Sequence, residues 1–145
     1  SAASDVYKRQ AGGMGGGFLA FLNAELKPGI RLMLDALDFG KKIKGADLIF
    51  TGEGRADRQT AMGKVPSGIL EEARKQNIPV IVLAGSIEDA DQMNWAGFQG
   101  VFSITPGPVS LENAMKPEFA KENIRRLVTQ ICSVIHPFRN SFSRR

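Results

Sequence analysis

Several residue types that carry common chemistries are scarce in this chain. Its 145 residues include one cysteine, one histidine, one tryptophan and one tyrosine. The single cysteine, Cys132, excludes an internal disulfide and fits a reducing compartment. The chain has no C-x-x-C pair, no metal-ligand spacing of His and Cys, and no Ser-His-Asp order. Thiol-redox, zinc and serine-hydrolase chemistry therefore lack their usual residues.

Long apolar runs are also missing. No run approaches the roughly 20 residues that a helix needs to cross a bilayer, and no signal peptide is visible at the start. We therefore expect a cytoplasmic protein without a membrane partner. Hydrophobic residues make up 43% of the chain and charged residues 23%, which is ordinary for one globular domain with its own core.

The positive charge is modest and lies partly at the two ends. The net charge is +4 and the sequence pI is about 9.5. A nucleic-acid binder needs a clustered basic face with aromatic residues that stack on bases. Because the charges are scattered and aromatics are few, we expect no nucleic-acid partner. The basic residues in the tails are Lys8, Arg9, Arg139, Arg144 and Arg145.

The ends also differ from the middle in pattern. Residues 1–10 show no apolar period and are interpreted as a linker or non-native segment. Residues 136–145 form an unpatterned, basic stretch that we expect to be a flexible tail. The organised region is then 11–135.

Helical and strand patterns alternate within the organised region. Continuous apolar runs bounded by glycine or proline predict strands, and apolar residues at helical spacing predict helices. This alternation favours β-α-β crossovers, and so an α/β fold with a parallel sheet and helices on both faces. The predicted strands are 47–51, 79–85 and 100–105. The predicted helices are 18–26, 30–37, 66–76, 88–98 and 118–135.

The most polar segment follows the first predicted strand. In open parallel sheets, ligands bind beyond the carboxyl ends of the strands, and the segment 52–64 ("GEGRADRQTAMGK") is expected there. Glu53 and Asp57 could hold Mg²⁺, which prefers carboxylate oxygens. Alternatively, they could pair with Arg55 and Arg58 as a solvated network of ion pairs.

Three more residues, two within this segment and one directly before it, each have two possible roles. Lys64 precedes a predicted helix, whose N-terminus favours phosphate; the alternative is a plain surface lysine. Thr51 and Thr60 could donate hydrogen bonds to a ligand, or cap the loop backbone.

A glycine cluster, "AGGMGGG", precedes the first predicted helix. It is not a Walker A motif, which requires G-x-x-x-x-G-K-[ST]. Backbone without side chains can still approach an anion closely at a helix start. The candidate phosphate-binding residues are Gly13, Gly15, Gly16 and Gly17; the alternative is a hinge.

Two interpretations concern packing. Met93, Trp95 and Phe98 have helical spacing and are expected in the core. Cys132 lies between apolar neighbours and is expected to pack inside as well.

Three stretches of the chain together resemble a known family. They are "GGMGGGFLAFLNAELKPGIRLMLDAL", "GADLIFTGEGRADRQTAMGKVPSGI" and "PVIVLAG". They are similar to the carboxyl-terminal part of bacterial glycerate kinases, the glycerate 2-kinase class that does not use a P-loop. The resemblance runs from about Ala11 to Ile135. Its most specific part is T-G-E-G-R-x-D-x-Q-T-x-x-G-K, found at Thr51, Gly52, Glu53, Gly54, Arg55, Asp57, Gln59, Thr60, Gly63 and Lys64.

The resemblance implies an activity and a larger protein. It implies ATP-dependent phosphorylation of D-glycerate, giving 2-phosphoglycerate, with Mg²⁺ as the metal. It also implies two α/β domains in a chain more than twice this length. The present chain would then be one part of that two-domain fold. Its partner would be the amino-terminal half of the same enzyme, which the resemblance implies is missing here.

The resemblance also implies roles for individual residues. Glu53, Asp57 and Lys64 are expected to be catalytic. Asp57 or Glu53 would hold Mg²⁺ or orient the glycerate hydroxyl, and Lys64 would contact phosphate. Arg55 would clamp the glycerate carboxylate by a two-pronged contact. The other expected substrate contacts are Thr51, Gln59 and Thr60.

A second function of a different class stays open. Since the resemblance implies a missing half, the chain could be a non-catalytic α/β module that binds a nucleotide or a small organic acid without turnover.

Overall fold

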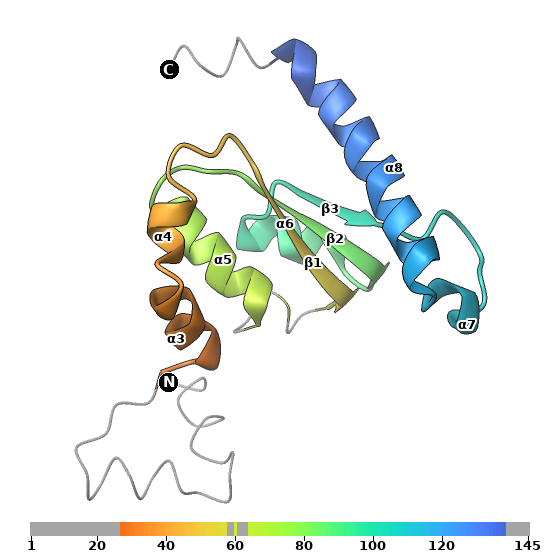
Figure 1. Ribbon diagram of the computed structural model, residues 1–145, viewed down its shortest axis with the longest axis horizontal. Helices are drawn as coiled ribbons and strands as arrows, with labels where there is room; N and C mark the ends of the chain where they lie inside the picture. The colour runs from red at the N-terminus through yellow and green to blue at the C-terminus, as the bar shows by residue number, and fades with distance from the viewer. Residues whose placement is uncertain (1–26, 58–59, 61–63, 139–145) are drawn as a thin grey trace, which may run out of the picture.

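The computed structural model describes residues 27–57, 60 and 64–138, and Figure 1 shows their arrangement. The predicted helix 18–26 lies outside these residues. No helix in the described part of the chain combines the length and the hydropathy that a membrane span requires. The elements are, in chain order, α3 (Gly29–Ala36), α4 (Phe39–Lys42), β1 (Ile49–Ala56), α5 (Val65–Arg74), β2 (Val80–Ile87), α6 (Ala90–Ala96), β3 (Gly100–Ser103), α7 (Leu111–Ala114), α8 (Pro117–Ile135) and the 3₁₀-helix η2 (His136–Phe138).

The strands form a parallel sheet in the order β1-β2-β3. Ile49 pairs with Val80 at the start of β1, and Ala56 pairs with Ile87 at its end. β3 pairs with β2 in the same direction. Because all pairs are parallel, the carboxyl ends of the strands meet at one edge of the sheet. The residues that follow β1 and β2 are therefore neighbours in space.

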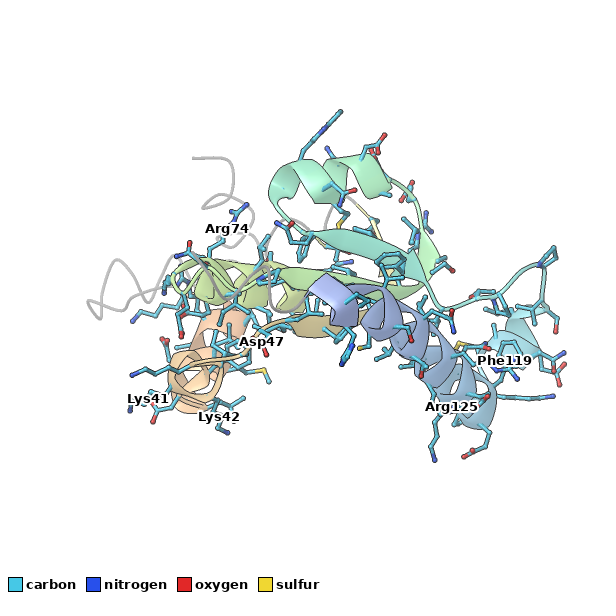
Figure 2. All side chains as sticks on the ribbon, turned by 90° about the horizontal axis from the view of Figure 1, so that it is seen from above. Lys41, Lys42, Asp47, Arg74, Phe119 and Arg125 are labelled. Atoms are coloured by element: carbon cyan, nitrogen blue, oxygen red, sulfur yellow. The ribbon has the colours of Figure 1, made fainter. Side chains whose placement is uncertain are left out.

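Helices cover both faces of the sheet. One face packs against α4, α5 and α6 in a core that contains Ile43, Leu70 and Met93. The other face packs against α8 through Ile131, with Leu127 partly buried beside it. Figure 2 shows α6 (green) and α8 (blue) on opposite sides of the strands. Both crossover helices lie on the same face, as right-handed connections require when strands are added in one direction. The predicted α/β fold is confirmed.

The central strand β2 is the most buried part of the molecule. Its first five residues, the apolar run 80–84, each have less than 9% of their surface exposed. Val80 and Val82 face the layer of α5 and α6, whereas Ile81 and Leu83 face α8. A strand buried on both faces needs such a continuous apolar run, which is why its sequence gave the clearest strand signal.

β1 is longer than the prediction. The segment 52–56 was expected in a loop, but it continues the strand and pairs with β2 as far as Ile87. Glycine weakens a strand in isolation. Here the backbone hydrogen bonds to β2 and the complete burial of Ala56 outweigh that preference. The prediction of a loop at 52–56 is therefore wrong, and the true loop begins at Asp57.

Two glycines face each other near the ends of β1 and β2. A Cβ built on Gly85 would lie 2.8 Å from the carbonyl oxygen of Gly54, too close for any side chain. Before this point Ile49 faces the α5 layer; after it, Ala56 and Ile87 do. Strict alternation would place Ile49 and Ala56 on opposite faces. Both strands therefore change face across the glycine pair.

Two expectations about packing were wrong. Met93 and Phe98 are buried as predicted, but Trp95 is 84% exposed. Positions two apart on a helix point about 200° apart, so α6 cannot bury both Met93 and Trp95. Cys132 is exposed for a similar reason, because its neighbour Ile131 takes the inward position on α8.

The glycine contact gives a stability prediction. Replacing Gly85 with Ala should lower the free energy of unfolding by about 1–3 kcal/mol, because the backbone of β1 must move to admit the methyl group. Gly54→Ala is the matched control, since nothing lies within 4 Å of a Cβ there. Denaturant unfolding followed by circular dichroism measures both. Equal losses in the two variants would contradict the close-contact explanation.

Candidate active site

The site is built where β1 ends and α5 begins. Ala56 is completely buried and fixes the end of the strand in the core. Asp57 is the first residue beyond it, and Lys64 is the N-cap of α5. Thr60 lies between them in sequence and is also completely buried.

Asp57 and Thr60 form a closed turn. The amide of Asp57 donates to Thr60 Oγ1 over 3.1 Å, and the amide of Thr60 donates to Asp57 Oδ1 over 3.1 Å. The Thr60 amide also lies 3.0 Å from the carbonyl oxygen of Asp57. These reciprocal bonds are the local motifs that Asp and Thr form in turns. They hold the Asp57 carboxylate against its own backbone.

Lys64 meets the same carboxylate. Its Nζ lies 3.3 Å from Asp57 Oδ1, and the side chains of Lys64 and Asp57 are 36% and 21% exposed. Burial raises the pKa of Asp57, but hydrogen bonds from Lys64 and Thr60, together with the lysine charge, outweigh it and lower the pKa from its ordinary value of 3.8. Asp57 is therefore an ionised carboxylate at neutral pH, paired with an ammonium group.

The backbone also fixes Lys64. Its carbonyl oxygen accepts a hydrogen bond from Ser67 Oγ over 2.8 Å. Pro66, in the first turn of α5, is completely buried and helps to begin the helix there. The ammonium group of Lys64 thus sits at the positive end of a ten-residue helix.

Arg55 has a partner that the sequence analysis did not single out. Its Nη2 lies 3.1 Å from Glu88 Oε2, with both side chains more than half exposed. Glu88 follows β2, and its amide donates to the carbonyl oxygen of Ala56 over 2.9 Å. The segment after β2 contains the acidic residues Glu88, Asp89 and Asp91, and these were the signal that could have indicated such a partner. Which of them meets Arg55 depends on the register of β1 and β2.

Thr51 and Glu53 lie further back along β1. Thr51 is only 6% exposed, and it pairs with Val82 in the middle of the sheet. Glu53 is half-buried. At about 3.3 Å per residue, the Cα atoms of Glu53 and Asp57 are separated by about 13 Å along the strand. The structure therefore gathers Asp57, Thr60 and Lys64 but not Thr51, and it separates the two candidate metal ligands.

The remaining candidate residues lie outside the described part of the chain. They are Gln59, Gly13, Gly15, Gly16 and Gly17, and their roles stay predictions. Among the described residues, hollows of about 450 and 400 Å³ are lined from α3, α4, α5 and α6, and neither of these two includes Asp57 or Lys64. The candidate site lies at the carboxyl edge of the sheet, with the side chains of Asp57 and Lys64 partly exposed.

Comparisons with known proteins identify the family of the chain. The model of the glycerate kinase family matches residues 8–136. The chain is 44% identical to glycerate kinase of Bacillus subtilis and 39% identical to glycerate 2-kinase of Escherichia coli; each match covers 86% of this chain and 32% of the relative. A crystal structure of a protein described as glycerate kinase 2 from Salmonella typhimurium LT2 superposes with a TM-score of 0.65 at 38% identity, and the match covers 90% of this chain and 33% of that one.

The fold is thus a parallel α/β sheet with an Asp–Lys pair between the end of β1 and the start of α5, and the comparisons assign it to a family of phosphotransferases. The chain belongs to the glycerate kinase family. It spans about a third of the length of the curated relatives that it matches.

The Asp57–Lys64 pair gives a prediction on pH. Replacing Lys64 with Met removes the ammonium group, so the pKa of Asp57 should rise from its lowered value; Lys64→Arg should keep it low. A carboxyl with a lowered pKa stabilises the fold above the ordinary value of 3.8, and this contribution is lost as the pH falls through the lowered pKa. The carboxyl ¹³C shift of Asp57 measures the titration.

The free energy of unfolding should depend on pH in the same direction. The difference in unfolding free energy between the unchanged chain and Lys64→Met should be fully present at neutral pH and shrink in acid. An Asp57 carboxyl that titrates at the same pH in both proteins would contradict the assigned cause.

Proposed function

We propose that this chain is the part of a glycerate kinase that supplies the phosphoryl-transfer residues, and that the complete enzyme phosphorylates D-glycerate with ATP. The observation that carries the proposal is the Asp57–Lys64 pair at the start of α5. It lies within a T-G-E-G-R-x-D-x-Q-T-x-x-G-K sequence of a chain that belongs to this family. The E. coli relative is named a glycerate 2-kinase, which supports 2-phosphoglycerate as the product.

Phosphoryl transfer depends on positioning and on charge rather than on covalent chemistry of the protein. Lys64 brings a positive charge to the helix N-terminus, where backbone N–H groups favour phosphate. Asp57 neutralises this charge in the absence of ligand. When a phosphoryl group reaches Lys64, the ammonium group shifts its partner, and the Asp57 carboxylate can accept the proton of the attacking glycerate hydroxyl or hold a cation.

Arg55 is proposed to bind the glycerate carboxylate. A guanidinium group can bind two carboxylates through different N–H groups, and a two-pronged contact fixes both distance and orientation. Glu88 already holds Nη2 of Arg55. We propose that Glu88 orients the guanidinium group, and that Thr51 and Gln59 contribute further contacts to the substrate.

Mg²⁺ fits this site as an ion held by one protein carboxylate together with the phosphates of ATP. Among the described residues, no group of three or more His, Cys, Asp or Glu side chains gathers to form a metal cage. Mg²⁺ in kinases is commonly held by one or two carboxylates together with substrate phosphates and water. Because Glu53 lies within β1 and Asp57 lies beyond its end, we propose that either carboxylate would serve singly. The ion, bound with ATP, would supply charge neutralisation at the phosphates.

The missing length supports a shared site. The relatives are about three times as long as the matched region, and the candidate site lies at an edge of the sheet, with Asp57 and Lys64 partly exposed. We propose that the remainder of a complete enzyme closes over Asp57 and Lys64 and supplies part of the ATP and glycerate contacts. The expected glycine contacts at Gly13, Gly15, Gly16 and Gly17 would add phosphate binding. We also propose the reducing cytoplasm as its compartment, in which the exposed Cys132 would stay a thiol.

The test compares two proteins. One is this chain, and the other is this chain joined to the part of the Bacillus subtilis relative that it lacks. We expect ADP release from ATP and Mg²⁺ that depends on D-glycerate in the joined protein only. If both proteins are folded and neither turns over, the kinase proposal is overturned. The alternative function, an α/β module that binds a nucleotide or small acid without turnover, is then favoured.

A single substitution tests the role of Asp57. In the joined protein, Asp57→Asn should lower kcat by about 10²–10⁴-fold, the range for loss of a general base. Glu122→Gln is the matched control, because Glu122 is a partly exposed carboxylate that forms ion pairs with arginines of its own helix, α8. Figure 2 shows its partner Arg125 on the outer side of that helix. Equal activity of the Asp57 variant and the unchanged protein would contradict the assignment.

A further inference from the structure

Thr60 is an unusual residue for a loop. Its exposed fraction is 0%, although it lies in the connection between β1 and α5. A hydroxyl group that leaves water must find hydrogen-bond partners within the protein, or the fold loses free energy. The partners of Thr60 therefore indicate what the residue does.

These partners belong to the strand end and to the candidate site. Thr60 Oγ1 lies 3.3 Å from the carbonyl oxygen of Arg55 and 3.2 Å from Asp57 Oδ1, and it accepts from the Asp57 amide over 3.1 Å. A hydroxyl group has one proton, so it donates to one of the first two oxygens at a time. The charged carboxylate is the stronger acceptor. Thr60 thus links the backbone at the end of β1, through the carbonyl oxygen of Arg55, to the side chain of Asp57.

The same oxygen of Asp57 is the one that Lys64 meets. Asp57 Oδ1 lies within 3.3 Å of the Thr60 amide, the Thr60 hydroxyl and Lys64 Nζ. Two donors from one buried residue set the position of that oxygen, and the oxygen in turn sets where the ammonium group rests. Complete burial keeps the Thr60 side chain away from any ligand at the surface.

We propose that Thr60 is a positioning residue: its hydroxyl and amide fix Asp57 Oδ1 at the point where Lys64 meets it, and Thr60 does not contact the substrate. The kinetic consequence of this inference rests on the proposed function. The positioning role takes the place of the substrate-binding role that the resemblance implies for Thr60. A misplacement of about 1 Å in a catalytic group can cost about 10²-fold in rate. A positioning residue should therefore affect kcat rather than substrate binding.

Two substitutions distinguish the effect of the Thr60 hydroxyl group from the effect of its side-chain volume. Thr60→Ser keeps the hydroxyl group, and Thr60→Val keeps the volume but leaves the Asp57 amide and the Asp57 carboxylate each without one partner. Thr129→Val is the matched control. Thr129 donates to the carbonyl oxygen of Arg125 over 2.8 Å on the exposed side of α8.

The kinetic arm uses the joined protein. We expect Thr60→Val to lower kcat by about 10²-fold, with the KM for D-glycerate changed by less than about threefold. Thr60→Ser should restore most of the rate, and Thr129→Val should change neither constant. A large rise in KM with kcat preserved would show a substrate contact and overturn the proposal. Unchanged kinetics in Thr60→Val would also overturn it.

The second arm needs no activity and uses this chain alone. Amide hydrogen exchange, measured residue by residue by NMR, reports whether the Asp57 amide remains bonded. We expect exchange at Asp57 to become at least about tenfold faster in Thr60→Val than in Thr60→Ser, while amides of β2 keep their protection. If the joined protein proves inactive, this arm still decides. An unchanged rate at Asp57 would overturn the positioning role, whatever becomes of the kinase proposal.

Discussion

The burial of β2 between two layers is the constraint on which the rest of the structure depends. Residues 80–84 lie between α5 and α6 on one side and α8 on the other. Burying each large aliphatic side chain stabilises the fold by about 1.5–3 kcal/mol. β2 is also the hydrogen-bonded partner of both β1 and β3. Where β2 lies thus decides where β1 ends, and with it where Asp57 leaves the sheet.

Charge at the site is balanced locally rather than left open. Asp57 meets Lys64, and Arg55 meets Glu88. The Asp57–Lys64 pair is partly shielded from water and the Arg55–Glu88 pair is exposed. Removing one partner should therefore change the energy of the remaining charge more in the first pair than in the second. Each of these four side-chain charges is therefore neutralised by a partner from the protein itself.

Much of the fold could be read from local patterns, because burial leaves a periodic trace. The run 80–84 and the apolar face of α8 were recognisable in this way. What failed depends on pairing between distant segments. The extension of β1 through glycines needs β2 beside it, and Glu88 becomes relevant only through the register that brings it to Arg55. Trp95 had the helical spacing of a core residue, but only packing decides which stripe of α6 turns inward.

The site could be predicted in part for the same reason. The resemblance assigned Asp57 and Lys64 to one site, but the arginines of the loop were the partners considered for Asp57, and the contact with Lys64 is found only in the structure. The burial of Thr60 could not be predicted, because it depends on how the loop folds back on the end of β1. Residue types therefore indicated the chemistry. Tertiary contacts distinguish the partly exposed Asp57 and Lys64 from the buried Thr60.

The parallel register has a consequence for how the chain reaches its native state. Ile49 pairs with Val80, and Ile81 pairs with Gly100, so every strand pair closes over an intervening helix. Within the sheet of the described residues, no hairpin can form first and guide the other strands. The loss of chain entropy on loop closure precedes the gain from pairing. Folding should therefore be slower than in helical bundles of this size, and α5 with its two flanking strands is the smallest unit that could nucleate it.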